Sequence, residues 1–159
     1  MLKVDDEYYT PKGAWADVSD YIPKNKTIWE CFYSPRSKSA DYLRELGCTN
    51  VISEDCDFYT SNHGDVIVTN PPFHQKEKLM ERLKELDKPF ILIFPIHSIR
   101  IHCVRQNFGG KVQFIIPRRR IHFEKYNDEK HVLERKNQNS FDCLYMCYKL
   151  NLNKDIIWL

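Results

Sequence analysis

The strongest structural signal in this chain is the stretch GDVIVTNPPFHQ, residues 64 to 75. Its first half is an apolar run between Gly64 and Asn70, typical of a short strand that is covered on both faces. Two prolines follow, and proline neither continues a strand ladder nor allows the residue before it to be helical. We therefore expect the strand to end at Asn70 in a rigid turn that presents an amide side chain, the carbonyl of Pro71 and the ring of Phe73.

On both sides of this stretch, short apolar runs alternate with amphipathic segments. The runs predict strands at 26–32, 49–55, 64–70 and 89–96, and the amphipathic segments predict helices at 37–47, 74–88 and 97–110. The rest predicts a strand or bent hairpin at 111–126, a mobile hairpin loop over the site at 127–140 and a last strand at 140–152. This alternation predicts an α/β fold, a Rossmann-like sheet that is mostly parallel with antiparallel strands at its C-terminal end.

Length and composition limit the remaining possibilities. The 159 residues suit a single domain spanning 1–159, with no separate domain for target recognition. The longest apolar run, at 90–96, is too short to cross a bilayer, and the first residues do not follow the order of a signal peptide. We therefore expect a soluble, intracellular protein. The six cysteines form no CxxC pair and the six histidines are scattered, which favours reduced, mostly buried thiols and gives a metal site little support.

Polar side chains follow three of the predicted strands: Glu30, the pair Glu54 and Asp55, and Asn70. The carboxyl ends of parallel strands meet at one edge of a sheet, so these side chains should converge there. At this edge the Asn70 and Pro71 carbonyl oxygens can each accept one hydrogen of an amine, while Phe73 stacks on the ring that carries it. An alternative interpretation remains open, in which Asn70 only caps the helix that follows.

VIVTNPPF resembles the catalytic motif of class I S-adenosylmethionine-dependent amino-methyltransferases, in particular the adenine-N6 DNA methyltransferases and their small phage and large-virus relatives. The resemblance covers most of the chain. It implies that Asn70, Pro71, Pro72 and Phe73 hold the reacting amine. The same motif also occurs in relatives that methylate a glutamine of translation release factors or the exocyclic amine of guanine in ribosomal RNA, so it does not select the substrate.

The resemblance also implies a set of cofactor-binding residues. YYTPKGAW at 8–15 is similar to the segment that lies against the methionine and adenosine of the cofactor in the family, and TIWECF and NVISEDCDFYT are similar to its first two strands. Glu54 or Asp55 would bind the ribose hydroxyls, Asp57 the adenine amine, and Phe58 the adenine ring. The complete implied set is Tyr9, Thr10, Pro11, Glu30, Phe32, Ser34, Glu54, Asp55, Asp57 and Phe58.

One segment departs from the family. After the first strand, the family has an acid-Pro-Phe-x-Gly-x-Gly loop, whose glycines let the backbone approach the cofactor. This chain has Ser34, Pro35 and Arg36 there. Either the loop is rebuilt, with Ser34 and Arg36 contacting the methionine carboxylate, or the chain is an inactive relative that binds nucleic acid or serves as a partner subunit.

The basic segment IIPRRRIHFEKY, at 115–126, suits a nucleic-acid substrate. Arg118, Arg119 and Arg120 would contact phosphates, and nearby aromatic rings could stack on unpaired bases. The alternative is a charged, solvated edge strand. His97 follows the fourth predicted strand and could touch the substrate at the same edge.

These observations predict methyl transfer to N6 of adenine in DNA or RNA. A base inside a duplex must be flipped out before its amine is accessible, so single-stranded nucleic acid or a flipped-out adenine is favoured. A partner subunit or a homodimer could supply recognition.

Overall fold

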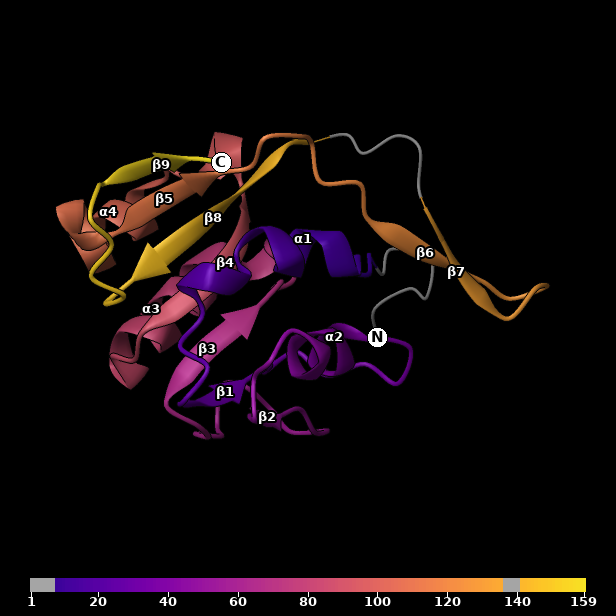
Figure 1. Cartoon of the computed structure of the whole chain (residues 1–159). Coiled ribbons are helices and arrows are strands. Elements are labelled where there is room, and N and C mark those ends of the chain that lie inside the picture. The colour runs from indigo at the N-terminus through magenta and orange to yellow at the C-terminus, as the bar shows by residue number, and fades with distance from the viewer. Residues whose placement is uncertain (1–7, 136–140) are drawn as a thin grey trace.

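The apolar runs of the sequence form the centre of one seven-stranded sheet in the computed structural model, which describes residues 8–135 and 141–159 (Figure 1). The strands lie in the order β2-β1-β3-β4-β8-β5-β9. Six run in the same direction and β8 runs opposite, between β4 and β5. The strands are β1 (Thr27–Trp29), β2 (Asn50–Ile52), β3 (Val66–Thr69), β4 (Phe90–Pro95), β5 (Gln113–Ile116), β8 (Cys143–Tyr148) and β9 (Ile156–Trp158).

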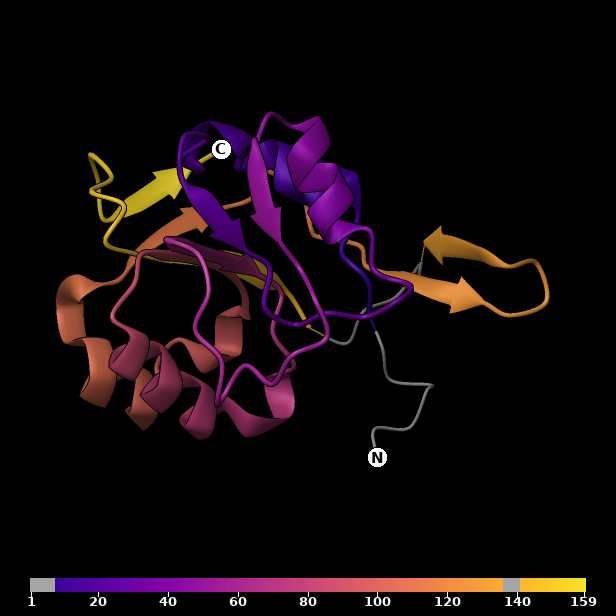
Figure 2. The ribbon, with the colours of Figure 1, turned by 90° about the horizontal axis from the view of Figure 1, so that it is seen from below.

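Helices cover both faces of this sheet (Figure 2). On one face lie α1 (Lys12–Asp17) and α2 (Ser39–Glu45), and on the other α3 (Lys76–Leu86) and α4 (His102–Phe108). Short 3-10 turns lie next to α1, α3 and α4 in the chain: η2 (Ser19–Tyr21), η3 (Phe73–Gln75), η4 (Ile96–Ser98) and η5 (Gly109–Lys111). The prediction of an α/β fold with a mostly parallel sheet and an antiparallel strand near the C-terminus is confirmed at this level.

The core alternates between the two faces along each central strand. In β4, Ile91 and Ile93 pack towards α1 and α2, whereas Phe90, Leu92 and Phe94 pack towards α3 and α4. All six residues of β4 are buried, as expected for a strand covered on both sides. The continuous apolar run at 89–96 is the sequence signature of this position.

Gly64 fixes the start of β3, the strand that leads to the Asn-Pro-Pro turn. Its φ of +63° lies in the left-handed region, and a Cβ there would lie 2.9 Å from the carbonyl oxygen of Thr27. A side chain would therefore meet both an unfavourable backbone conformation and the neighbouring strand.

A second, two-stranded sheet extends from the body on the side where the parallel strands end (Figures 1 and 2). It pairs β6 (Glu124–Asn127) with β7 (Val132–Arg135). The strand or bent hairpin expected at 111–126 is wrong, because Pro117 and the arginines separate β5 from β6 and these two strands belong to different sheets. The expected loop at 127–140 is also wrong over 132–135, which form β7; residues 136–140 lie outside the described residues.

Other predicted elements differ in extent. The segment 97–110 is a 3-10 turn followed by the short helix α4, and the sequence prediction missed α1 and β9. The strands expected at 26–32 and 49–55 each have only three residues. No helix among the described residues is both long and apolar enough to cross a lipid bilayer.

Candidate functional site

A cavity of about 610 Å³ lies at the carboxyl ends of β1, β2 and β3. Its walls come from the three loops that follow these strands, together with Tyr8 and Phe141. The structure brings together in it eight of the residues singled out in the sequence: Phe32, Ser34, Asp57, Phe58, Asn70, Pro71, Pro72 and Phe73. The volume is within the range of small-molecule sites.

Asn70 lines this cavity immediately after β3. Its side-chain oxygen Oδ1 is buried and accepts no hydrogen bond in the part of the chain that the structure describes. The alternative that Asn70 caps the following helix is wrong, since Gln75 is the N-cap residue of α3 and no side chain caps that helix. A buried acceptor without a donor is costly, which makes Asn70 a candidate to bind an N–H group of a ligand.

Aromatic rings form the wall beside Asn70. Phe73 meets Phe141 edge to face, with ring centroids 5.5 Å apart and an interplanar angle of 88°. Phe141 in turn contacts Tyr8 at a centroid distance of 5.9 Å. Sequence reasoning missed Tyr8 and Phe141. The antiparallel direction of β8 could have indicated Phe141, because such a strand begins at the edge where the parallel strands end.

Asp57 and Phe58 form the wall that follows β2. Phe58 is almost fully buried, and its ring packs against Phe32 at 4.9 Å and Trp29 at 5.6 Å between centroids. Asp57 is exposed, and its Oδ1 accepts a hydrogen bond of 2.9 Å from the backbone N–H of Tyr59. This local turn holds the carboxylate at the cavity, where it can accept a hydrogen bond from a ligand.

Glu30 does not line the cavity. It is buried, and its two carboxylate oxygens accept hydrogen bonds from the hydroxyls of Thr69, at 2.6 Å, and Ser53, at 3.1 Å. Burial raises the pKa of the Glu30 carboxyl, although these hydroxyls act in the opposite direction. Glu30 thus ties together the ends of β1, β2 and β3 behind the cavity at which its contact with the cofactor was expected.

Glu54 and Asp55, expected at the ribose, are exposed and do not line the cavity. Glu54 Oε1 lies 3.5 Å from His63 Nε2 instead. The expected contact through the aromatic-Thr-Pro segment is also displaced. Tyr9 is buried and pairs by backbone hydrogen bonds with Glu124 of β6.

In the same segment, Thr10 is buried and Pro11 is the N-cap residue of α1. Neither residue lines the cavity. Tyr8, one position earlier than the residues singled out, is the member of this segment that does.

The loop that replaces the glycine-rich motif needs no glycine for its backbone. None of residues 31–37 has a positive φ, and the N–H of Ser37 closes a turn on the carbonyl of Ser34 at 3.0 Å. Ser34 lines the cavity, as expected. Arg36 does not: its guanidinium lies 2.9 Å from Asp128 and 4.1 Å from the ring centroid of Tyr126, so it attaches the loop to the β6–β7 hairpin.

The predicted substrate residues lie outside the cavity. Arg118, Arg119 and Arg120 are exposed in the connection between β5 and β6. Arg120 pairs with Asp142 at 2.7 Å and donates to the carbonyl of Phe141 at 3.2 Å, so it braces the segment that carries Phe141. His97 is exposed in η4, after β4.

No protein-family model and no curated protein matches this chain. The cavity therefore has to be interpreted from its own chemistry. Two of the six unpaired cysteines, Cys31 and Cys56, line it. Burial raises the pKa of the Cys31 thiol well above its ordinary value, which makes it a poor nucleophile. Within the described residues no three metal-ligating side chains form a group that could hold an ion.

The described walls of the cavity combine polar and aromatic groups. It offers an unpaired amide oxygen, a proline turn, aromatic faces and one exposed carboxylate. One histidine, His74, also lines it.

Proposed function

We propose that this chain is an S-adenosylmethionine-dependent amino-methyltransferase with a class I, Rossmann-like sheet, and that it acts on N6 of adenine in nucleic acid. The observation that carries the proposal is that Asn70 lines the cavity and that its buried Oδ1 has no hydrogen-bond donor among the described residues. Among the described residues that line the cavity, Asn70 is the one with a buried side-chain oxygen that lacks a donor, and an N–H group of a ligand would supply one.

The residues around Asn70 suit an aryl amine. Asn70 Oδ1 and the Pro71 carbonyl accept its two hydrogens, which draws the nitrogen lone pair out of conjugation with the ring. Phe73 provides an apolar face for that ring. No strong base is needed, because the amine becomes acidic only once it has been alkylated; positioning and polarisation supply the rate.

The other end of the cavity fits the methyl donor. The Asp57 carboxylate would accept from the adenine amine, the rings of Phe32 and Phe58 would contact the adenine, and Ser34 would hydrogen-bond to the methionine carboxylate. S-adenosylmethionine supplies an electrophilic methyl group when it is bound. Since the 33–36 turn contains no left-handed residue, the side chains that replace the family's glycines are compatible with a formed loop.

A second candidate function is a catalytically inactive relative that binds nucleic acid or serves as a partner subunit. It is favoured by Glu30 and Arg36, whose polar groups contact Thr69, Ser53 and Asp128 rather than the cavity. If this candidate is correct, the aromatic cavity would bind a base with no methyl donor beside it.

Calorimetric titration with S-adenosylmethionine and S-adenosylhomocysteine distinguishes the two candidates. We expect micromolar dissociation constants, equivalent to about 8 kcal/mol. Asp57→Ala should weaken both ligands, and Asp55→Ala, an exposed carboxylate outside the cavity, is the matched control. No binding of either ligand to the wild-type chain, and no shift of its melting temperature, would reject the methyltransferase in favour of the inactive relative.

A further inference from the structure

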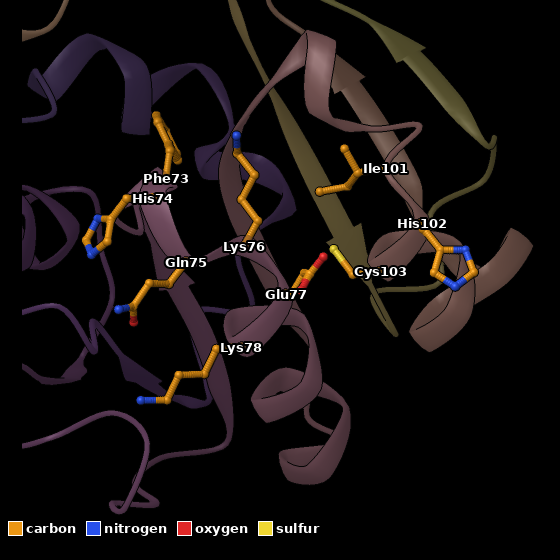
Figure 3. Close-up of a pocket in the computed structure, with 9 residues that line it drawn as sticks. All are labelled: Phe73, His74, Gln75, Lys76, Glu77, Lys78, Ile101, His102 and Cys103. Atoms are coloured by element: carbon orange, nitrogen blue, oxygen red, sulfur yellow. The ribbon is translucent and has the colours of Figure 1, made fainter.

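A second hollow of about 500 Å³ adjoins the cavity at the start of α3 (Figure 3). Phe73 and His74 line both hollows, so the two meet at these side chains. The other walls come from the first turn of α3 and the start of α4, including Lys76, Ile101 and His102. None of these last three residues belongs to the site already described.

The lining of this hollow is predominantly basic. Its lining contains two lysines, Lys76 and Lys78, one carboxylate, Glu77, and two histidines, His74 and His102. Glu77 is directed towards Cys103 and not towards either lysine (Figure 3). The hollow therefore suits an anion.

Lys76 is the cation best placed to contact such an anion. It is half-buried, and its side chain extends towards the Phe73 end of the hollow (Figure 3). Across the described ranges, no carboxylate lies within ion-pair distance of its ammonium group. Lys78 is engaged differently, since its ammonium lies 4.0 Å from the ring centroid of Tyr59, which lines the large cavity.

We propose that this hollow binds a backbone phosphate of a single nucleic-acid strand whose base occupies the cavity beside Asn70, with Lys76 as the principal contact. The inference rests on the proposed function and adds a contact site for the backbone of its substrate. A base stacked on Phe73 remains attached to its sugar and phosphate, and the adjoining hollow receives them on the other side of Phe73. A protein glutamine, which brings no phosphate, would leave the Lys76 charge unused.

Fluorescence anisotropy of a labelled single-stranded oligonucleotide tests this without any methyl donor. Log K falls as log salt rises, and each phosphate contact makes this slope steeper by about 0.7 for a single strand. Lys76→Gln should lower the slope by about that amount and weaken binding about fivefold at low salt. Lys84→Gln, an exposed lysine in the last turn of the same helix, is the matched control and should leave both unchanged.

Equal slopes for wild type, Lys76→Gln and Lys84→Gln would overturn the inference. The same would follow if Lys76→Glu, which reverses the charge, bound as tightly as wild type. Performing the titration with DNA and RNA strands of one sequence distinguishes the two sources of the phosphate, and loss of slope with either supports the site. Because no donor is present, a failure here is separate from a failure to bind S-adenosylmethionine.

Discussion

Replacing Asn70 with alanine separates a binding role of its side chain from a structural one. No donor among residues 8–135 and 141–159 reaches the buried Oδ1, and a buried acceptor without a donor costs about 1–3 kcal/mol. Asn70→Ala removes that cost and loses little packing, because the side chain borders a cavity of about 610 Å³. We expect the free energy of unfolding to rise by about 1 kcal/mol, a gain of about 2–4 °C in melting temperature for a chain of this size.

Activity should change in the opposite direction. Removing one preorganised hydrogen-bonding group from a reacting centre typically lowers kcat by about 10²–10³. Methyl transfer to an adenine-containing single strand should therefore fall by at least that factor in Asn70→Ala. Binding of S-adenosylmethionine, measured by calorimetry, should be unchanged, since the donor is assigned to Asp57, Phe58 and Ser34.

The control is Asn50→Ala, an exposed amide at the start of β2, on the opposite edge of the sheet. It should change stability by less than about 0.5 kcal/mol and leave transfer unaltered. Our reasoning would be refuted if Asn70→Ala lost about 0.5–2 kcal/mol, the cost of deleting a structural cap, or if it methylated at the wild-type rate.

Three further predictions concern other parts of the chain. Burial raises the pKa of Glu30 in the folded state, so the folded state binds more protons than the unfolded state. The free energy of unfolding should therefore fall as pH rises above the ordinary carboxyl pKa, by about 1.4 kcal/mol for each pH unit between the folded and unfolded pKa. Glu30→Gln should remove this fall in urea titrations between pH 4 and 8, and an unchanged pH profile would contradict the prediction. Gly64→Ala should lower the free energy of unfolding by about 2–4 kcal/mol, because φ is left-handed there and the new Cβ would lie 2.9 Å from a backbone oxygen. Gly110→Ala, which has open space around it, should lower it by less than about 1 kcal/mol. Similar melting temperatures for the two variants would disprove the strain at Gly64. Arg118→Ala combined with Arg119→Ala should weaken nucleic-acid binding and lower its salt slope by about 0.7 for each phosphate that these arginines neutralise, and an unaltered slope would show the arginines to be only surface charge.

The parallel half of the sheet could be predicted because β3 and β4 are buried on both faces. In a chain without a membrane-length segment, a short continuous apolar run is typical of a strand covered by helices on either side. Strand direction predicted that Glu30, the pair Glu54 and Asp55, and Asn70 converge at one edge. Of these residues Asn70 lines the cavity and the three acids do not, whereas Ser34 and Asp57, which do, were implied by the family resemblance. The short elements could not be found in the same way, since α1 has six residues and β9 only three, too few for a periodic pattern.

A hairpin loop was expected at 127–140, but the strands β6 and β7 were missed, for a different reason. These strands are half-buried or exposed, and their residues do not alternate between apolar and polar. What stabilises them is pairing with each other and the bridge between Tyr9 and Glu124, a contact between residues far apart in the sequence. Local patterns carry no information on such a contact.

The roles of Glu30 and Arg36 depend on side-chain direction, which strand patterns do not determine. Glu30 occurs where an acid of the cofactor site was expected, but Thr69 and Ser53 supply hydroxyls on its buried side. Arg36 has a partner 92 positions away in sequence, Asp128. In both cases the residue type predicted a polar contact near the cavity. The direction of the side chain depended on neighbours from other segments.

The altered loop can be reinterpreted in these terms. A glycine is required where the backbone is left-handed or where a ligand approaches the main chain closely. The first condition does not hold at 33–36, since no residue there has a positive φ. Arg36 instead joins the loop to the hairpin through Asp128 and Tyr126, so the wall of the cavity that contains Ser34 is held by a second segment. The Ser-Pro-Arg sequence is therefore compatible with a formed loop, one that contacts the hairpin through Arg36.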